Sequence, residues 1–166
     1  MRPGSPGWWA TKVRQAFRHV RARVSARERD SLLPWLTPAQ LALFDSMHVA
    51  DRRHGLDVAA ALRRAGERDP EVLLAGLLHD AGKGQTGIAP RVVYALGVAY
   101  GRWIETPFRR FGLAAALDRL AAHAETSARL AEGAGCSSRT VELIRWQDAP
   151  RDPDAGERLR LADEAN

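Results

Sequence analysis

Residues 72–84 have the sequence VLLAGLLHDAGKG, in which an apolar run ends in the adjacent pair His79 and Asp80 and is followed by two glycines flanking Lys83. Glycines after an apolar run are a helix stop signal, so the pattern predicts a buried helix that ends at this pair. A carboxylate beside apolar residues is costly to bury unless a partner balances its charge. Histidine and aspartate are both metal-ligand types, so the end of this helix is a candidate site for metal-assisted hydrolysis.

The sequence on either side predicts further helices and no strand, because apolar residues recur at helical spacing and no window alternates over more than a few residues. Thr37-Pro38 and Asp69-Pro70 are start signals, in which a capping side chain precedes proline at the first helical position. We expect helices over residues 38–47, 48–64, 71–80, 91–103, 108–122, 123–132, 138–146 and 155–164. The predicted fold is all-α: a compact bundle of about seven or eight helices in residues 31–166, preceded by an N-terminal arm over residues 1–30.

The size and composition are those of one globular domain. With 166 residues the chain is long enough to bury a core. Its single cysteine, Cys136, excludes an internal disulfide and a cysteine-rich zinc site. No segment approaches the roughly 20 apolar residues of a membrane span, and basic residues interrupt the start of the chain, unlike a secretory signal. We therefore expect a cytoplasmic protein, with peripheral contact to a membrane left open for the arm.

The positive charge is concentrated at the start of the chain. Residues 1–27 hold seven Lys or Arg and no acid, so the other 139 residues carry 18 basic and 20 acidic side chains. Apolar residues at positions 9, 13, 17, 20 and 24 define one face of a basic amphipathic helix. Three interpretations of residues 8–27 stay open: packing on this domain or on a partner subunit of a homo-oligomer, contact with a membrane surface, and contact with nucleic acid, which basic charge alone supports least.

Two further residues are candidates to join His79 and Asp80. His54 lies one helix upstream, and Asp163 lies next to an apolar pair in the last predicted helix. The order His54, His79-Asp80, Asp163 resembles the H…HD…D signature of the HD-domain superfamily of metal-dependent phosphohydrolases. The resemblance spans roughly residues 40–166 and is carried by the strings RRHGLDVAAAL (52–62), VLLAGLLHDAGKG (72–84) and RLADEAN (160–166).

The resemblance implies an HD-domain helical bundle with a metal site made by His54, His79, Asp80 and Asp163. Two imidazoles and two carboxylates form a mixed nitrogen and oxygen set that leaves coordination positions for water and a phosphate oxygen. The family suggests a divalent ion of Mn, Fe, Co, Ni or Mg, with Zn also allowed. The implied function is hydrolysis of a phosphoester in a small, nucleotide-like substrate by water that the metal activates.

Lys83 is notable because the chain has 23 arginines and only two lysines. A lysine is a compact, strongly hydrated point charge, and the resemblance to the family's HDxGK pattern implies that Lys83 holds phosphate or pairs with Asp80. We predict catalytic roles for Lys83 and for Asp80. Asp80 or a neighbouring acid would orient the nucleophile. Arg52 and Arg53 are predicted to bind or steer phosphate, although positions on a surface helix explain them nearly as well.

The resemblance extends only partly to a second metal. Two-metal members of the superfamily add a histidine at the start of a later helix, which His123 matches, and one or two more after the next helix. Gln147 and Asp148 stand at that later place, and glutamine is a poor ligand. His123 and Asp148 are therefore second-tier candidates for a second metal or for substrate contact, and Asp80 would be the bridging carboxylate.

An alternative function also fits the sequence. The chain can be a regulatory or binding module that keeps the fold and the metal but hydrolyses little or nothing, while its basic arm docks to a membrane surface or a partner protein. The small size of the chain and Gln147 favour this alternative. Metal-dependent release of phosphate distinguishes the two functions.

Overall fold

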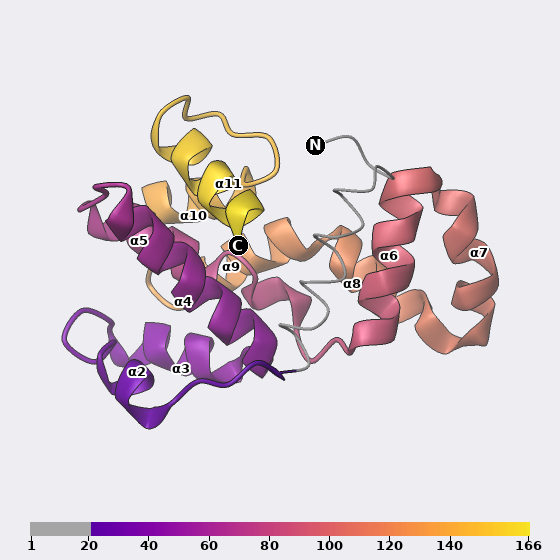
Figure 1. Ribbon diagram of the computed structural model, residues 1–166, viewed down its shortest axis with the longest axis horizontal. Helices are drawn as coiled ribbons and strands as arrows, with labels where there is room; N and C mark the ends of the chain where they lie inside the picture. The colour runs from indigo at the N-terminus through magenta and orange to yellow at the C-terminus, as the bar shows by residue number, and fades with distance from the viewer. Residues whose placement is uncertain (1–20) are drawn as a thin grey trace.

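The computed structural model describes residues 21–166, and in these residues the chain is helical and has no strand (Figure 1). The all-α prediction is therefore confirmed for this part, whereas the arm prediction falls mainly on residues 1–20, outside the described residues. None of the helices described is both long and apolar enough to cross a membrane. The helices are α2 (Ala26–Asp30), α3 (Pro38–Ser46), α4 (Val49–Arg64), α5 (Pro70–Leu78), η1 (Ala81–Lys83), α6 (Ile88–Tyr100), η2 (Arg102–Ile104), α7 (Glu105–Phe108), η3 (Arg109–Leu113), α8 (Ala114–Ala121), α9 (His123–Gly133), α10 (Ser138–Arg145) and α11 (Ala155–Ala165).

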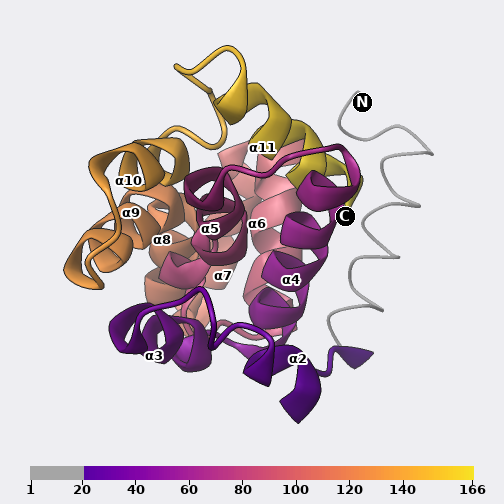
Figure 2. The ribbon, with the colours of Figure 1, turned by 90° about the vertical axis from the view of Figure 1, so that its left-hand side faces the viewer.

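Helix α5 is the centre of the hydrophobic core. Every residue from Val72 to Leu78 is buried, and α5 packs against α3, α4, α10 and α11 (Figures 1 and 2). A helix that is apolar on all sides is stable only when other elements surround it. Its end therefore delivers His79 and Asp80 into the interior, where both side chains are 2% exposed.

The two predicted start signals are confirmed, but the central helix ends earlier than predicted. Thr37 and Gln40 form a capping box at the start of α3, and Asp69 accepts a hydrogen bond from the backbone N–H of Glu71 at the start of α5. Helix α5 ends at Leu78, two residues before the predicted end. The chain then tightens into the 3-10 turn η1, which packs against α9.

The structure differs most from prediction between residues 88 and 114. Helix α6 begins earlier than predicted and ends at Tyr100, and the next residue, Gly101, has a φ of 111° that favours glycine. The predicted helix over 108–122 is divided by Gly112, with φ of 89°, into the short α7–η3 segment and α8. In Figure 1, α6 and α7 stand to one side of α4, α5 and α11. Two glycines in a helix-like pattern therefore convert two predicted helices into a hairpin-like lobe.

Two glycines allow close backbone contacts that position the site. A Cβ on Gly55 of α4 would lie 2.3 Å from the carbonyl oxygen of Leu77 in α5. A Cβ on Gly82 of η1 would lie 2.4 Å from the carbonyl oxygen of His123 at the start of α9, and the N–H of Gly82 donates to Ser127 Oγ at 2.8 Å. These contacts bring α4 and α9 onto the segment that carries His79 and Asp80.

Ion pairs around the start of α5 are expected to make the fold less stable in acid. A hydrogen bond from Arg139 holds the pKa of Asp69 below its usual value, and hydrogen bonding by the N–H of Asp69 together with the charge of Arg158 lowers the pKa of Glu67. Such carboxyls stabilise the fold above their unfolded pKa of about 4, and this contribution is lost as pH falls through the folded value. We expect the melting temperature to drop steadily below about pH 4. The melting temperature of Arg139→Met should fall less steeply with decreasing pH than that of the native chain. Identical slopes of melting temperature against pH would contradict the assignment.

Candidate metal centre

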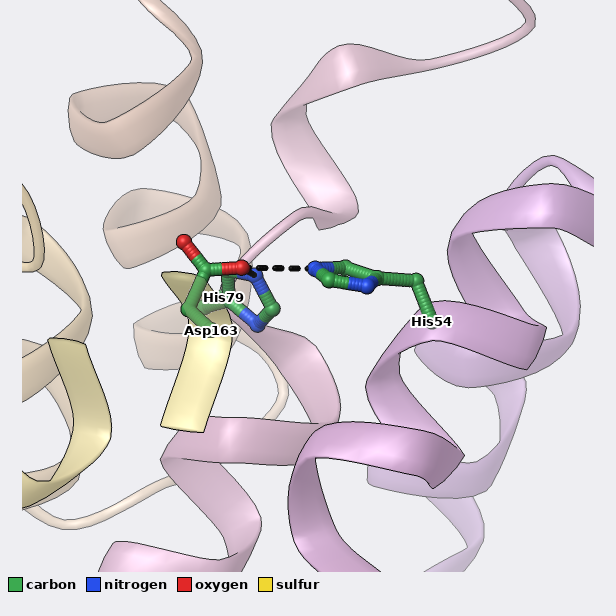
Figure 3. Close-up of side chains that lie close together, drawn as sticks. All are labelled: His54, His79 and Asp163. Carbon is green, nitrogen blue, oxygen red and sulfur yellow. Dashed lines mark hydrogen bonds and ion pairs between the residues drawn. The ribbon is translucent and has the colours of Figure 1, made fainter. Parts of the chain in front are cut away.

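Three potential metal ligands from distant parts of the chain meet at the end of α5 (Figure 3). His54 comes from α4, His79 follows α5 and Asp163 comes from α11. Their ligand atoms all lie within 4.8 Å of one another. His54 Nε2 is 2.6 Å from Asp163 Oδ1, and His79 Nε2 is 3.4 Å from the same oxygen. The cluster could therefore hold a metal ion.

His79 presents an unused ring nitrogen to this cluster. Its Nδ1 lies 2.9 Å from the carbonyl oxygen of Gly76, which can only accept, so Nδ1 carries the proton and donates. This orients Nε2 toward the carboxylates of Asp163 and Asp80, at 3.4 and 3.5 Å, and Nε2 has no hydrogen-bond partner although it is buried. A backbone carbonyl on the far nitrogen is the usual support of a metal-ligating histidine.

Asp80 lies beside the three-residue cluster and presents one free oxygen. Its Oδ2 accepts a hydrogen bond from Lys83 Nζ at 2.6 Å. Its buried Oδ1 has no hydrogen-bond partner and is 3.5 Å from His79 Nε2. Burial alone would raise the pKa of the Asp80 carboxyl, but the positive charges of His79 and Lys83 outweigh burial and hold that pKa well below its usual range. Asp80 is therefore an ionised carboxylate with one oxygen turned toward His79.

The electrostatics of the centre favour a cation. Burial lowers the pKa of His79, but the negative charges of Asp80 and Asp163 outweigh burial and raise it to about 9. The acids around His79 thus favour positive charge at Nε2, which is either the proton of the imidazolium or a metal ion that replaces it. Because a buried unpartnered polar atom is costly, the free Nε2 of His79 and the free Oδ1 of Asp80 both fit a bound divalent ion. The predicted ligands His54, His79 and Asp163 are brought together, and Asp80 adjoins them.

His123 lies next to Asp80, but the acceptor nitrogen of its ring is already hydrogen-bonded to Gln147. The Nδ1 of His123 donates to the carbonyl oxygen of Leu120 at 2.7 Å, so its Nε2 is the acceptor. That Nε2 lies 3.8 Å from Asp80 Oδ1 and accepts a hydrogen bond from the Gln147 side-chain amide at 3.0 Å. Asp148, the other second-tier candidate, is exposed on the turn after α10 and lies near enough for its charge to raise the pKa of His123, which burial and Lys83 lower overall.

Arg52 and Arg53, predicted to bind phosphate, are engaged in ion pairs. Arg53 pairs with Glu28 of α2 and with Asp57 one turn along α4. Arg52 lies 3.9 Å from Asp45. These pairs fasten α2 and α3 to α4 and provide a structural reason for both arginines. Their role in binding substrate stays a prediction.

Two contributors to the centre were missed in the sequence. Asp51, 3% exposed, forms a two-pronged ion pair with Arg91 of α6, at 2.8 and 2.6 Å. Burial lowers the pKa of Lys83, but Asp80 and then Asp51 outweigh burial and raise it, so Lys83 stays charged. Ser127, fully buried, fixes η1 through Gly82. An acid one turn before His54 was the available signal for Asp51, whereas nothing in the spacing linked it to Arg91.

Comparisons of the chain with protein-family models, with characterised proteins and with solved structures give no match.

Proposed function

We propose that the chain is a metal-dependent phosphohydrolase of the HD type, which hydrolyses a phosphoester in a small, nucleotide-like molecule. The observation that carries this proposal is the cluster of His54, His79 and Asp163, with Asp80 adjoining it and with free polar atoms on His79 and Asp80 in the interior. The sequence resemblance supplies the chemistry, and the donor set agrees with it.

In this proposal, some side chains of the centre bind the ion and others bind the substrate. A divalent ion bound there would supply Lewis acidity and a reactive water near neutral pH. His54, His79 and Asp163 would hold it, and Asp80 would orient the attacking water through Oδ1. Lys83, whose side chain is 23% exposed, is tied to Asp80 and is charged. It can therefore donate one hydrogen bond to Asp80 while its remaining ammonium protons bind a phosphate oxygen.

A single metal is favoured over two. His123 is the only second-tier histidine, and its Nε2 already accepts a hydrogen bond from Gln147. A ligand nitrogen that is occupied by a neutral donor must lose that bond before it can bind an ion. His123 and Gln147 are therefore better placed to contact substrate than to hold a second ion.

Hydrolysis by the protein loaded with Mn, Fe, Co, Ni, Mg or Zn tests the proposal, followed as phosphate release or, for cyclic substrates, as ring opening to the monophosphate. Nucleoside mono-, tri- and cyclic phosphates are the substrates to try, and chelation should abolish the activity. We expect Lys83→Met to lower kcat/KM by about tenfold or more, because one charge-assisted phosphate contact is lost. Arg129→Met removes an exposed arginine on α9 and should leave the rate unchanged. A metal-loaded protein that is inert toward all these substrates would overturn the assignment for them.

The same measurement addresses the second candidate function, a regulatory module with little or no hydrolysis. The observation that favours it is the hydrogen bond between Gln147 and His123, because the acceptor nitrogen of His123 is then already engaged. A chain that binds one metal tightly and hydrolyses none of these substrates would support it. The membrane or partner contact of the basic arm belongs to this alternative and is tested by deleting residues 1–27.

A further inference from the structure

Exposed apolar side chains are concentrated in residues 88–117, which we call the lobe. Of the ten large hydrophobic residues that are exposed in residues 21–166, seven lie between positions 88 and 111. Trp103 is 73% exposed and Phe111 is 84% exposed. The others of the seven are Ile88, Val92, Val98, Tyr100 and Phe108. Single exposed apolar residues need no explanation, but a concentration of them marks an interaction surface. We call residues 100–111 the aromatic tip; Figure 1 shows it at the α7 end of the lobe.

The only acid of the lobe, Glu105, is buried, whereas the aromatic residues around it in the sequence are exposed. Glu105 is 1% exposed, and its Oε2 lies 3.1 Å from Arg102 Nη2 and 3.4 Å from Arg109 Nη2. Its carboxylate lies against Gly97 of α6, where a Cβ would be 2.5 Å from Oε1. Burying a carboxylate is costly. A tip that contacts only water would instead expose the acid and bury the aromatic residues. Glu105 joins the tip to α6, while the aromatic residues of the tip are exposed.

The accessible charge of the lobe is positive. Residues 88–117 contain four arginines, at positions 91, 102, 109 and 110, and Glu105 is the only acid among them. Arg102 and Arg110 are exposed next to Trp103 and Phe111. The next acid along the chain, Asp118, pairs with Arg109 at 2.7 Å. The tip thus combines exposed aromatic rings with arginines and presents no exposed acid of its own.

We propose that the aromatic tip docks onto the surface of an anionic lipid membrane. Tryptophan, tyrosine and phenylalanine partition into the interfacial region of a bilayer, and arginines beside them bind anionic headgroups. A second copy of the chain fits less well, because apposed tips would bring the arginines of the two copies together. The proposal rests on the tip alone and does not depend on the function of the metal centre.

Vesicle flotation with the full chain tests the proposal. The native protein should float with vesicles of phosphatidylglycerol and phosphatidylcholine in equal amounts, should bind far less to phosphatidylcholine alone, and should dissociate in high salt. The double variant Trp103→Ser, Phe111→Ser should bind about tenfold more weakly or worse. The matched control is Leu33→Ser, Leu130→Ser, which removes two exposed apolar residues elsewhere and should bind like the native protein. Circular dichroism checks that both variants fold.

Two results would overturn the proposal. If the tip variant binds the mixed vesicles as tightly as the control, any membrane contact is made elsewhere in the chain. If the native protein does not bind vesicles but sediments as a dimer that the tip variant dissociates, the tip is an interface between copies.

Discussion

Asp163→Asn is expected to weaken binding of the divalent ion by about 100-fold or more, so that the purified variant carries almost no metal. Changes to residues that only support metal ligands already cost about 10- to 100-fold, and Asp163 lies within contact of both His54 and His79. Asparagine has nearly the same shape but no charge, and the ion would then be balanced only by Asp80. Elemental analysis gives occupancy and titration calorimetry gives affinity, with one ion per native chain expected.

The neighbouring acid provides a matched control for this variant. Glu164 follows Asp163 on α11, is exposed, and pairs with Arg160 on the same helix. Glu164→Gln removes the same charge at the next position and should keep native metal content. Equal metal content in Asp163→Asn and in the native protein would remove Asp163 from the ligand set.

Gly55→Ala should lower the free energy of unfolding by about 3 kcal/mol, although alanine is the better helix former. The new methyl group would lie 2.3 Å from the carbonyl oxygen of Leu77, and this neighbour is backbone of the central helix. To relieve the clash, α4 must move away from α5, which opens the packing around Val58 and Leu62 and displaces His54. For a chain of this length the melting temperature should fall by roughly 10 °C.

Gly133→Ala separates the steric effect from helix propensity. Gly133 is also helical, at the end of α9, and a Cβ there would meet no atom within 4 Å. We expect this variant to be unchanged or more stable by up to about 1 kcal/mol. Thermal and urea unfolding of both variants provides the comparison. A Gly55→Ala chain as stable as Gly133→Ala would show that α4 and α5 do not approach as closely as described.

Local signals predicted the parts of the fold that depend on local chemistry. Thr37-Pro38 and Asp69-Pro70 fix two helix starts because capping and proline geometry act within three residues. The apolar run after Asp69 identified the central helix because no exposed helix is apolar on all sides. The meeting of His54, His79 and Asp163 was expected from the family resemblance, since spacing alone cannot bring together residues more than 100 positions apart.

The rest depended on contacts between distant segments. The hydrogen bond from Gln147 to His123 could not be predicted, because a sequence shows which side chains can ligate a metal but not which donor meets a given acceptor. The ion pair of Asp51 with Arg91 joins two helices whose relative placement was unknown. The division of the lobe at Gly101 and Gly112 was missed because a glycine within a helical pattern does not reveal whether its φ is positive.

The 2.6 Å contact between His54 and Asp163 joins residues 109 positions apart. These atoms are adjacent only when α4 and α11 are both docked on α5, so the unfolded chain cannot offer the same ligands. An ion that binds only the native state stabilises it by mass action, by about 2.7 kcal/mol when its free concentration is 100 times the Kd. We therefore expect the thermal stability of this protein to rise with the free concentration of the proposed ion.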